Sequence, residues 1–243
     1  MRPRILLPFL VAPLLVAGPF DPRPDLEAGR YLKVLADAEA QLRGEPRNAL
    51  AWAAKSQALS SLQRFGEGYG AAERALALQP QLADALLARG LARAGMAVQQ
   101  RNFSSLRNAS GALDDLEQAT KADPRLVTAW MSLGLAYEQL PGLLGGSTRK
   151  ALECANGLRR VNAARGDVLQ GMVLSMDERW REAEPYFGRA LALAPWDPEV
   201  VYGYLDSLGS RETRKQLGEG EQKRRLAAEA RRLLPPVRTR AKA

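Results

Sequence analysis

The sequence predicts an all-α protein built from repeated helical hairpins. Ala, Leu and Arg dominate its 243 residues and β-branched residues are scarce, a composition that favours helix. Prolines recur at related intervals after Ala-rich stretches with helical spacing. Pro46 and Pro80 are 34 residues apart, and Pro124 and Pro195 are separated by 71, close to two such periods. Because a proline cannot continue a helix, each one marks a boundary between units.

The first 18 residues have the pattern of a secretory signal peptide. Arg2 and Arg4 precede an apolar run from Ile5 to Ala17, and small residues follow. Thirteen apolar residues interrupted by two prolines are too few to span a bilayer as a helix. We therefore expect an exported protein, periplasmic or secreted, with no stable transmembrane segment.

A solitary helix is expected next, within residues 25–45, and then the repeats over residues 46–235. One unit holds the clearest motif, Trp130, Leu133, Gly134 and Tyr137. A second pattern, of the kind that completes such a unit, alternates small and bulky residues before a proline. It consists of Ala183, Phe187, Ala190 and Pro195. The chain thereby resembles the tetratricopeptide repeat (TPR) family, whose unit is a helix-turn-helix. The resemblance implies a right-handed superhelical solenoid of about five units.

Two stretches interrupt the repeat. The segment from Val98 to Ser110 is an insertion between the two helices of the second unit. The segment from Glu138 to Leu152 lengthens the turn of the third unit. There Pro141 ends one helix, Gly145 and Gly146 can turn the chain back, and Ser147 can cap the next helix.

The positive charge of the chain is concentrated at its end. Of the formal net charge of +8, residues 210–243 contribute eleven Lys or Arg against four Glu. We expect residues 236–243 to form a basic disordered tail. Nucleic acid is a poor candidate partner, because glutamates are interleaved and no aromatic residue is present there for base stacking.

Candidate catalytic groups are few. The chain has no histidine, which removes the commonest general base and metal ligand. Its single cysteine, Cys154, has the helical spacing of a buried thiol and cannot form an intramolecular disulfide. We therefore expect no enzyme activity, no cofactor and no metal site.

Two short motifs have ordinary structural interpretations. Gly66, Gly68 and Ala71 have the spacing of a dinucleotide-binding loop but follow a helical stretch, so they indicate a turn between paired helices. The carboxylate pairs Asp114-Asp115 and Asp197-x-Glu199 are placed near helix starts, where acidic residues stabilise the helix dipole.

A second apolar stripe runs along the first helices of the units, about 100° round each helix from the motif face. In the TPR family this face lines a concave groove. The resemblance places these side chains there: Leu87, Leu91, Met131, Leu135, Met172, Met176 and Tyr202. Basic and amide residues of the kind that hold a terminal carboxylate in some family members are missing from these positions.

A Met-rich apolar groove suits apolar or amphipathic guests, because thioethers adapt to irregular shapes. The first expectation is a non-enzymatic protein that binds a protein or peptide partner through this groove. The lengthened turn, with Leu143, Leu144, Gly145 and Gly146, would form its lid or floor. That turn also resembles loops in TPR accessory subunits of solute transporters, which implies a carrier of a small apolar ligand as the alternative. Equally, the chain could fill its own groove, with Leu143, Leu144 or Phe103 as candidates.

Overall fold

The computed structural model describes residues 20–99 and 103–234. The expected signal peptide and basic tail lie outside these residues, as does the side chain of Phe103. The described chain is helical throughout, with thirteen α-helices, one 3-10 turn and no strand in these two ranges. The predicted all-α class is confirmed.

The helices follow one another with short connections. Their bounds are α1 Arg23–Glu27, α2 Tyr31–Gly44, α3 Ala49–Ser61, α4 Phe65–Leu78, α5 Ala83–Gln99, α6 Phe103–Ala122, α7 Val127–Gln139, η1 Gly142–Leu144, α8 Thr148–Arg159, α9 Ala163–Met176, α10 Trp180–Leu193, α11 Pro198–Gly209, α12 Arg211–Leu217 and α13 Glu219–Leu233.

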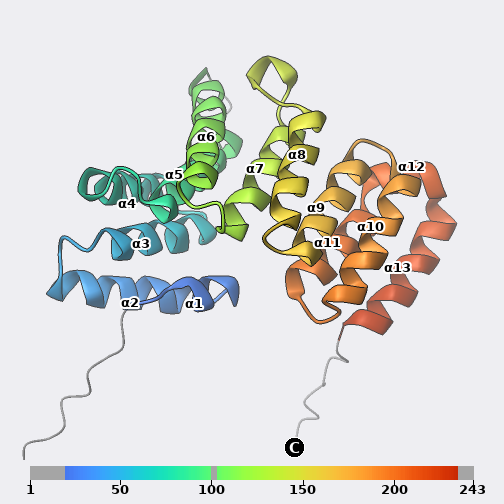
Figure 1. The fold of residues 1–243 in the computed structure, drawn as a ribbon, viewed down its shortest axis with the longest axis horizontal. Helices are drawn as coiled ribbons and strands as arrows, with labels where there is room; N and C mark the ends of the chain where they lie inside the picture. The colour runs from blue at the N-terminus through green and yellow to red at the C-terminus, as the bar shows by residue number, and fades with distance from the viewer. Residues whose placement is uncertain (1–19, 100–102, 235–243) are drawn as a thin grey trace, which may run out of the picture.

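Antiparallel hairpins are the repeating unit. α3 packs on α4, α5 on α6, α7 on α8, and α9 on α10, while α11 pairs with α13 across the short α12. The hairpins follow each other along an arch, with α2 at one end and α13 at the other (Figure 1). This confirms the solenoid of about five units that the resemblance to the TPR family implies.

The motif residues act as the spacing predicts. Leu133, Gly134 and Tyr137 are buried in the main core, and a Cβ at Gly134 would lie 2.9 Å from Leu169 of the next unit. Two tryptophans share one role: the indoles of Trp52 and Trp130 each donate to the carbonyl of the proline six residues earlier, at 2.9 Å. These two unit boundaries are thereby fixed to the helices that follow them.

Three expectations are corrected. The first helix is broken, because α1 and α2 are separated at Gly29, whose φ is +69°. Gly66 and Gly68 lie within α4 rather than in a turn, and the missing Cβ of Gly68 allows the approach of Ser60 on α3. Asp115 is in the middle of α6, not near a helix start.

The last correction follows from the insertion in the second unit. Residues 98–99 and 103–110 belong to the helices on either side, because α5 reaches Gln99 and α6 begins at Phe103. Asp115 is consequently buried along a long hairpin, where it forms ion pairs with Arg89 and Arg93 of α5 at 2.6 and 3.0 Å.

The junction between the second and third units is less regular than the others. α3 packs on α5, and both α7 and α11 pack on α9, whereas α7 meets the second unit mainly through α6. The solenoid therefore has an N-terminal half, α2–α6, and a C-terminal half, α7–α13, which meet at this junction (Figure 1).

Candidate functional site

An apolar groove of about 750 Å³ lies in the C-terminal half. α7 contributes Met131 and Leu135, and α9 contributes Met172. α11 contributes a row of side chains that includes Tyr202. Leu226 and Ala230 of α13 close the other wall, together with Leu234, which follows the helix. Four of the seven expected groove residues are thus brought together: Met131, Leu135, Met172 and Tyr202.

The groove has a buried side and an exposed side. Met131 is only 7% exposed, so most of its surface is already packed in the core. Tyr202, on α11, is 61% exposed. Such an exposed aromatic side chain beside an apolar surface is typical of interaction sites, because it offers a large contact area at low entropic cost.

A second hollow, the notch, occupies about 330 Å³ at the junction of the two halves. Leu87 and Leu91 of α5 line it, together with Arg23 and Leu26 of α1 and Tyr31 of α2. The structure therefore separates these two expected groove residues from the other four. Met176 lines neither hollow.

Arg23 holds α1 in the notch. Its guanidinium donates to both carboxylate oxygens of Asp84 on α5, at 3.3 and 2.8 Å, and lies 3.8 Å from Asp123. Asp84 is buried, and its hydrogen bond raises the pKa of Arg23 further. At the junction, α1 thus lies across a hollow from the expected groove residues Leu87 and Leu91, and Leu87 is only 1% exposed.

The lengthened turn lies elsewhere, at the tip of the α7–α8 hairpin (Figure 1). Gly145 has the left-handed φ of +94°, and Ser147 caps α8 by accepting from Lys150 N at 3.3 Å, as expected. η1 packs against α6, while Leu143 remains 84% exposed. Leu143, Leu144, Gly145 and Gly146 line neither the groove nor the notch.

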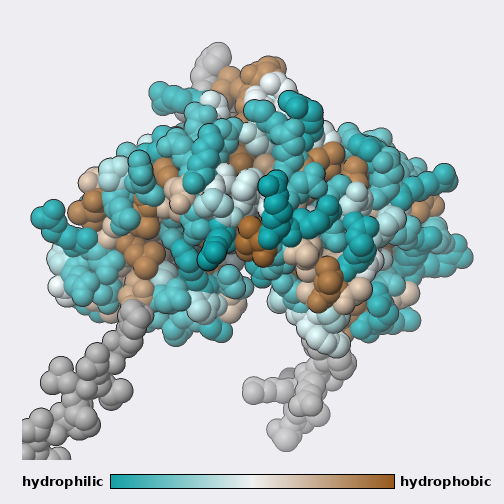
Figure 2. All heavy atoms as spheres, viewed as in Figure 1, coloured by the Kyte–Doolittle hydropathy of each residue, from teal (hydrophilic) through white to brown (hydrophobic). Residues whose placement is uncertain are grey.

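Figure 2 shows the hydropathy of one face of the molecule. The surface is mostly hydrophilic, apolar residues gather at the tip of the α7–α8 hairpin, and the outline is indented between the two ends of the arch. The apolar tip and the groove are therefore separate features.

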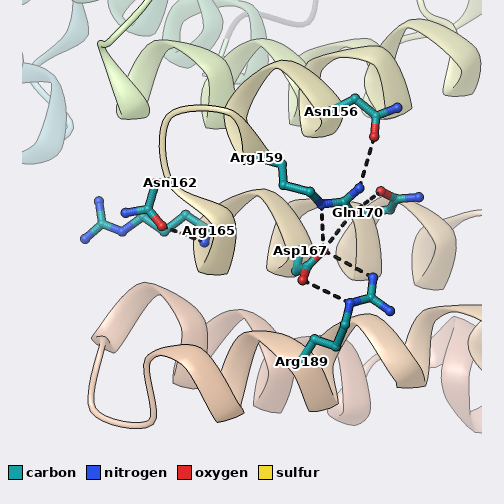
Figure 3. A network of polar contacts seen from close by, with 7 residues as sticks. All are labelled: Asn156, Arg159, Asn162, Arg165, Asp167, Gln170 and Arg189. Carbon is teal, nitrogen blue, oxygen red and sulfur yellow. Dashed lines mark hydrogen bonds and ion pairs between the residues drawn. The ribbon is translucent and has the colours of Figure 1, made fainter.

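An ion-pair network fixes α9, which carries Met172, between its neighbours (Figure 3). Asp167 of α9 accepts from Arg159 of α8 at 2.8 Å and from Arg189 of α10 at 3.2 Å. Arg159 also donates to Gln170 at 2.6 Å. Asp167 precedes Gly171 by four residues, as Trp130 precedes Gly134, so a buried carboxylate replaces the tryptophan in this unit.

The start of α11 is fixed in the same way. Asp197 caps the helix by accepting from Glu199 N at 2.9 Å, which confirms its expected place at a helix start. Its carboxylate also accepts from Arg165 of α9 at 3.0 Å. α9 and α11, which both line the groove, are therefore held in place by side chains that lie outside it.

The described residues offer little for catalysis. Burial raises the pKa of the Cys154 thiol to about 12, which keeps it protonated at neutral pH. Within residues 20–99 and 103–234, no cluster of three or more Cys, Asp or Glu could hold a metal ion.

None of the helices in the described ranges is both long and apolar enough to cross a membrane.

Several site residues were missed by sequence reasoning. Arg23, Leu226 and Leu234 come from the ends of the chain, where no repeat motif predicts which face is buried. A signal existed for α13: Leu226, Ala230 and Leu234 recur every four residues, the spacing of one helix face.

Comparison with known proteins supports the fold. A thermophilic TPR protein of Thermus thermophilus superposes with a TM-score of 0.65 at 20% identity, covering 77% of this chain and 95% of the other. A tetratricopeptide repeat protein of Parabacteroides merdae gives 0.53 at 17% identity, covering 87% and 75%. No family model and no curated protein matches the sequence. The chain therefore has a TPR-like fold.

Proposed function

We propose that this chain is an exported, non-enzymatic scaffold that holds an apolar segment of a partner protein in the groove. The observation that carries the proposal is the exposed Tyr202 beside the row formed by Met131, Leu135 and Met172. Helices that bury apolar anchors in a groove between other helices are a common mode of peptide recognition. The methionines can repack around different anchors.

Export is part of this proposal. It is supported by the arginines and the apolar run of residues 1–18. Amino-terminal sequencing of the protein from its host tests it directly: a mature chain that begins near residue 18 supports export, whereas an intact Met1 or Arg2 contradicts it.

Binding of a small apolar ligand, as in an accessory subunit of a transporter, is the alternative. The volume of about 750 Å³ lies in the range of ligand pockets. Such pockets bury most of the surface of their ligand, however, and Tyr202, Glu199 and Asp206 leave this groove open to solvent. The open side favours a segment of a larger molecule.

Site-specific photo-cross-linking separates the two. A benzophenone amino acid at position 202 should form a discrete polypeptide adduct in the host, and peptide mapping should give the bound segment. The same group at Trp196, which is 79% exposed but does not line the groove, is the matched control.

The possible outcomes distinguish a scaffold from a small-ligand carrier. An adduct at position 202 that is missing at position 196 supports the scaffold. A small molecule retained in native mass spectrometry, without an adduct, supports the carrier. Equal adducts at both positions, or neither adduct nor ligand, contradict the proposal.

A further inference from the structure

The charge of the groove is opposite to that of the chain. Among the described residues that line the groove, only Glu199 and Asp206 are charged, and both are exposed on α11. The whole chain has a formal net charge of +8. An acidic edge on a basic protein is therefore a local property of this surface.

Both carboxylates lack a partner in the described part of the molecule. Neither side chain forms a hydrogen bond or an ion pair there, whereas Asp197, at the start of the same helix, pairs with Arg165. Two arginines of α13 are also occupied: Arg225 pairs with Glu184 and Glu221, and Arg232 pairs with Glu229. The charge of the edge is thus available to a bound molecule.

The spacing of the two carboxylates is regular. Glu199, Tyr202 and Asp206 follow each other at three and four residues, so they lie on one stripe of α11. Seven residues of helix place the two carboxylates about 10.5 Å apart along the axis, with the tyrosine between them. A second helix lying along α11 would match them with two basic residues that are also seven apart.

We propose that the segment held in the groove is a basic amphipathic helix of a partner protein. Its apolar stripe would contact Met131, Met172 and Tyr202, and two Lys or Arg, seven residues apart, would pair with Glu199 and Asp206. This inference rests on the proposed function and adds the chemistry of the partner. Apolar burial supplies most of the affinity, and two exposed ion pairs add about tenfold, an increment that salt reduces.

Synthetic helical peptides test the inference with the full chain. The first probe is an Ala/Leu helix of about 16 residues, long enough to be partly helical in water, with a leucine stripe and two lysines seven apart beside it. The second has glutamates at the same two positions. Fluorescence anisotropy at low salt should show the lysine peptide binding about tenfold more tightly, in spite of the net positive charge of the protein.

The variant Glu199→Gln/Asp206→Asn should reduce that preference to within about twofold, because it removes two exposed ion pairs. Its matched control is Asp114→Asn/Glu153→Gln, which changes the net charge equally at two exposed positions outside the groove. The control should keep the preference. Circular dichroism should show all three proteins folded, since each of the four positions is exposed.

The results that would contradict the basic partner differ from those that would contradict the proposed function. If both peptides bind equally and the variant changes neither, the basic partner is wrong while the groove remains a peptide site. A preference for the glutamate peptide, or a lysine preference that persists in the variant, also overturns the inference. If neither peptide binds, the proposed function fails as well.

Discussion

The two halves of the concave face differ in what covers them. At the junction, Leu87 and Leu91 line a hollow together with residues of α1, which an ion pair with the buried Asp84 holds in place. In the C-terminal half, Met131, Leu135 and Met172 lie beneath no further helix of the described chain, and Tyr202 is exposed. Equivalent positions of one repeat thus serve as core in one unit and as surface in another. The repeat pattern determines which residues lie on the concave face. The segments that flank the repeats determine whether those residues are buried or exposed.

The largest expected effect comes from a matched pair of substitutions. Leu87→Asp should lower the free energy of unfolding by about 3–5 kcal/mol, because it buries a charge with no partner. Tyr202→Asp should change it by no more than about 0.5 kcal/mol, as at most exposed positions. Urea denaturation measures both. Similar losses at the two positions would contradict the difference between the halves.

Arg23→Ala should release α1 without disturbing the groove. It leaves the buried Asp84 without its partner, so hydrogen exchange in α1 should become about tenfold faster, equivalent to about 1.4 kcal/mol. Arg30→Ala is the matched control, because the ion pair that Arg30 forms within the described residues is the local one with Asp25 of α1 and does not reach α5.

Cys154 reports whether the C-terminal half opens as well. Its buried thiol, with a pKa of about 12, should react with a disulfide reagent more than about 1,000-fold slower than a free thiol at neutral pH. That rate should stay the same in Arg23→Ala. Faster labelling would mean that the two halves open together.

The smallest effect is expected at Glu138 of α7. Burial raises the pKa of this carboxyl, and its Oε2 has no partner. The folded state therefore holds the proton more tightly, so stability falls as pH rises from the unfolded pKa of about 4.3 through the higher folded pKa. Glu138→Gln should raise stability at neutral pH by less than about 1 kcal/mol.

Denaturation at several pH values measures this gain, which should vanish below about pH 4. Combining Glu138→Gln with Arg23→Ala then tests the comparison itself. Additive changes would show that the two halves are energetically independent, and a coupling above about 0.5 kcal/mol would show that they are not.

Much of the solenoid could be predicted because its signals are local. Proline ends a helix within one residue, and the spacing of Trp130, Leu133, Gly134 and Tyr137 defines one helix face without reference to the rest of the chain. Helix spacing alone could not show that residues 98–99 and 103–110 belong to the two long helices α5 and α6. This is why Asp115 was expected at a helix start.

Local sequence patterns could not predict which part of the concave face is buried and which is exposed. The contact between Arg23 and Asp84 joins residues 61 apart, and neither residue belongs to the repeat motif. Periodicity identified Tyr202 and Leu87 as equivalent, but their exposed fractions of 61% and 1% depend on which other segments pack there. The same reasoning applies to Leu226 and Leu234, which belong to the least regular unit.

The contact between Arg23 and Asp84 has a consequence for the order of folding. Among the described residues, the ion pairs that do not involve Arg23 join positions at most 41 apart, as in Arg225–Glu184. Stacked repeats fold through contacts between neighbours, whereas the entropy lost on closing a loop grows with its length. We therefore expect α1 to dock last, on hairpins that are already formed. Until then the chain passes through a folded state in which the concave face is open from Leu87 to Tyr202, longer than the surface it finally keeps.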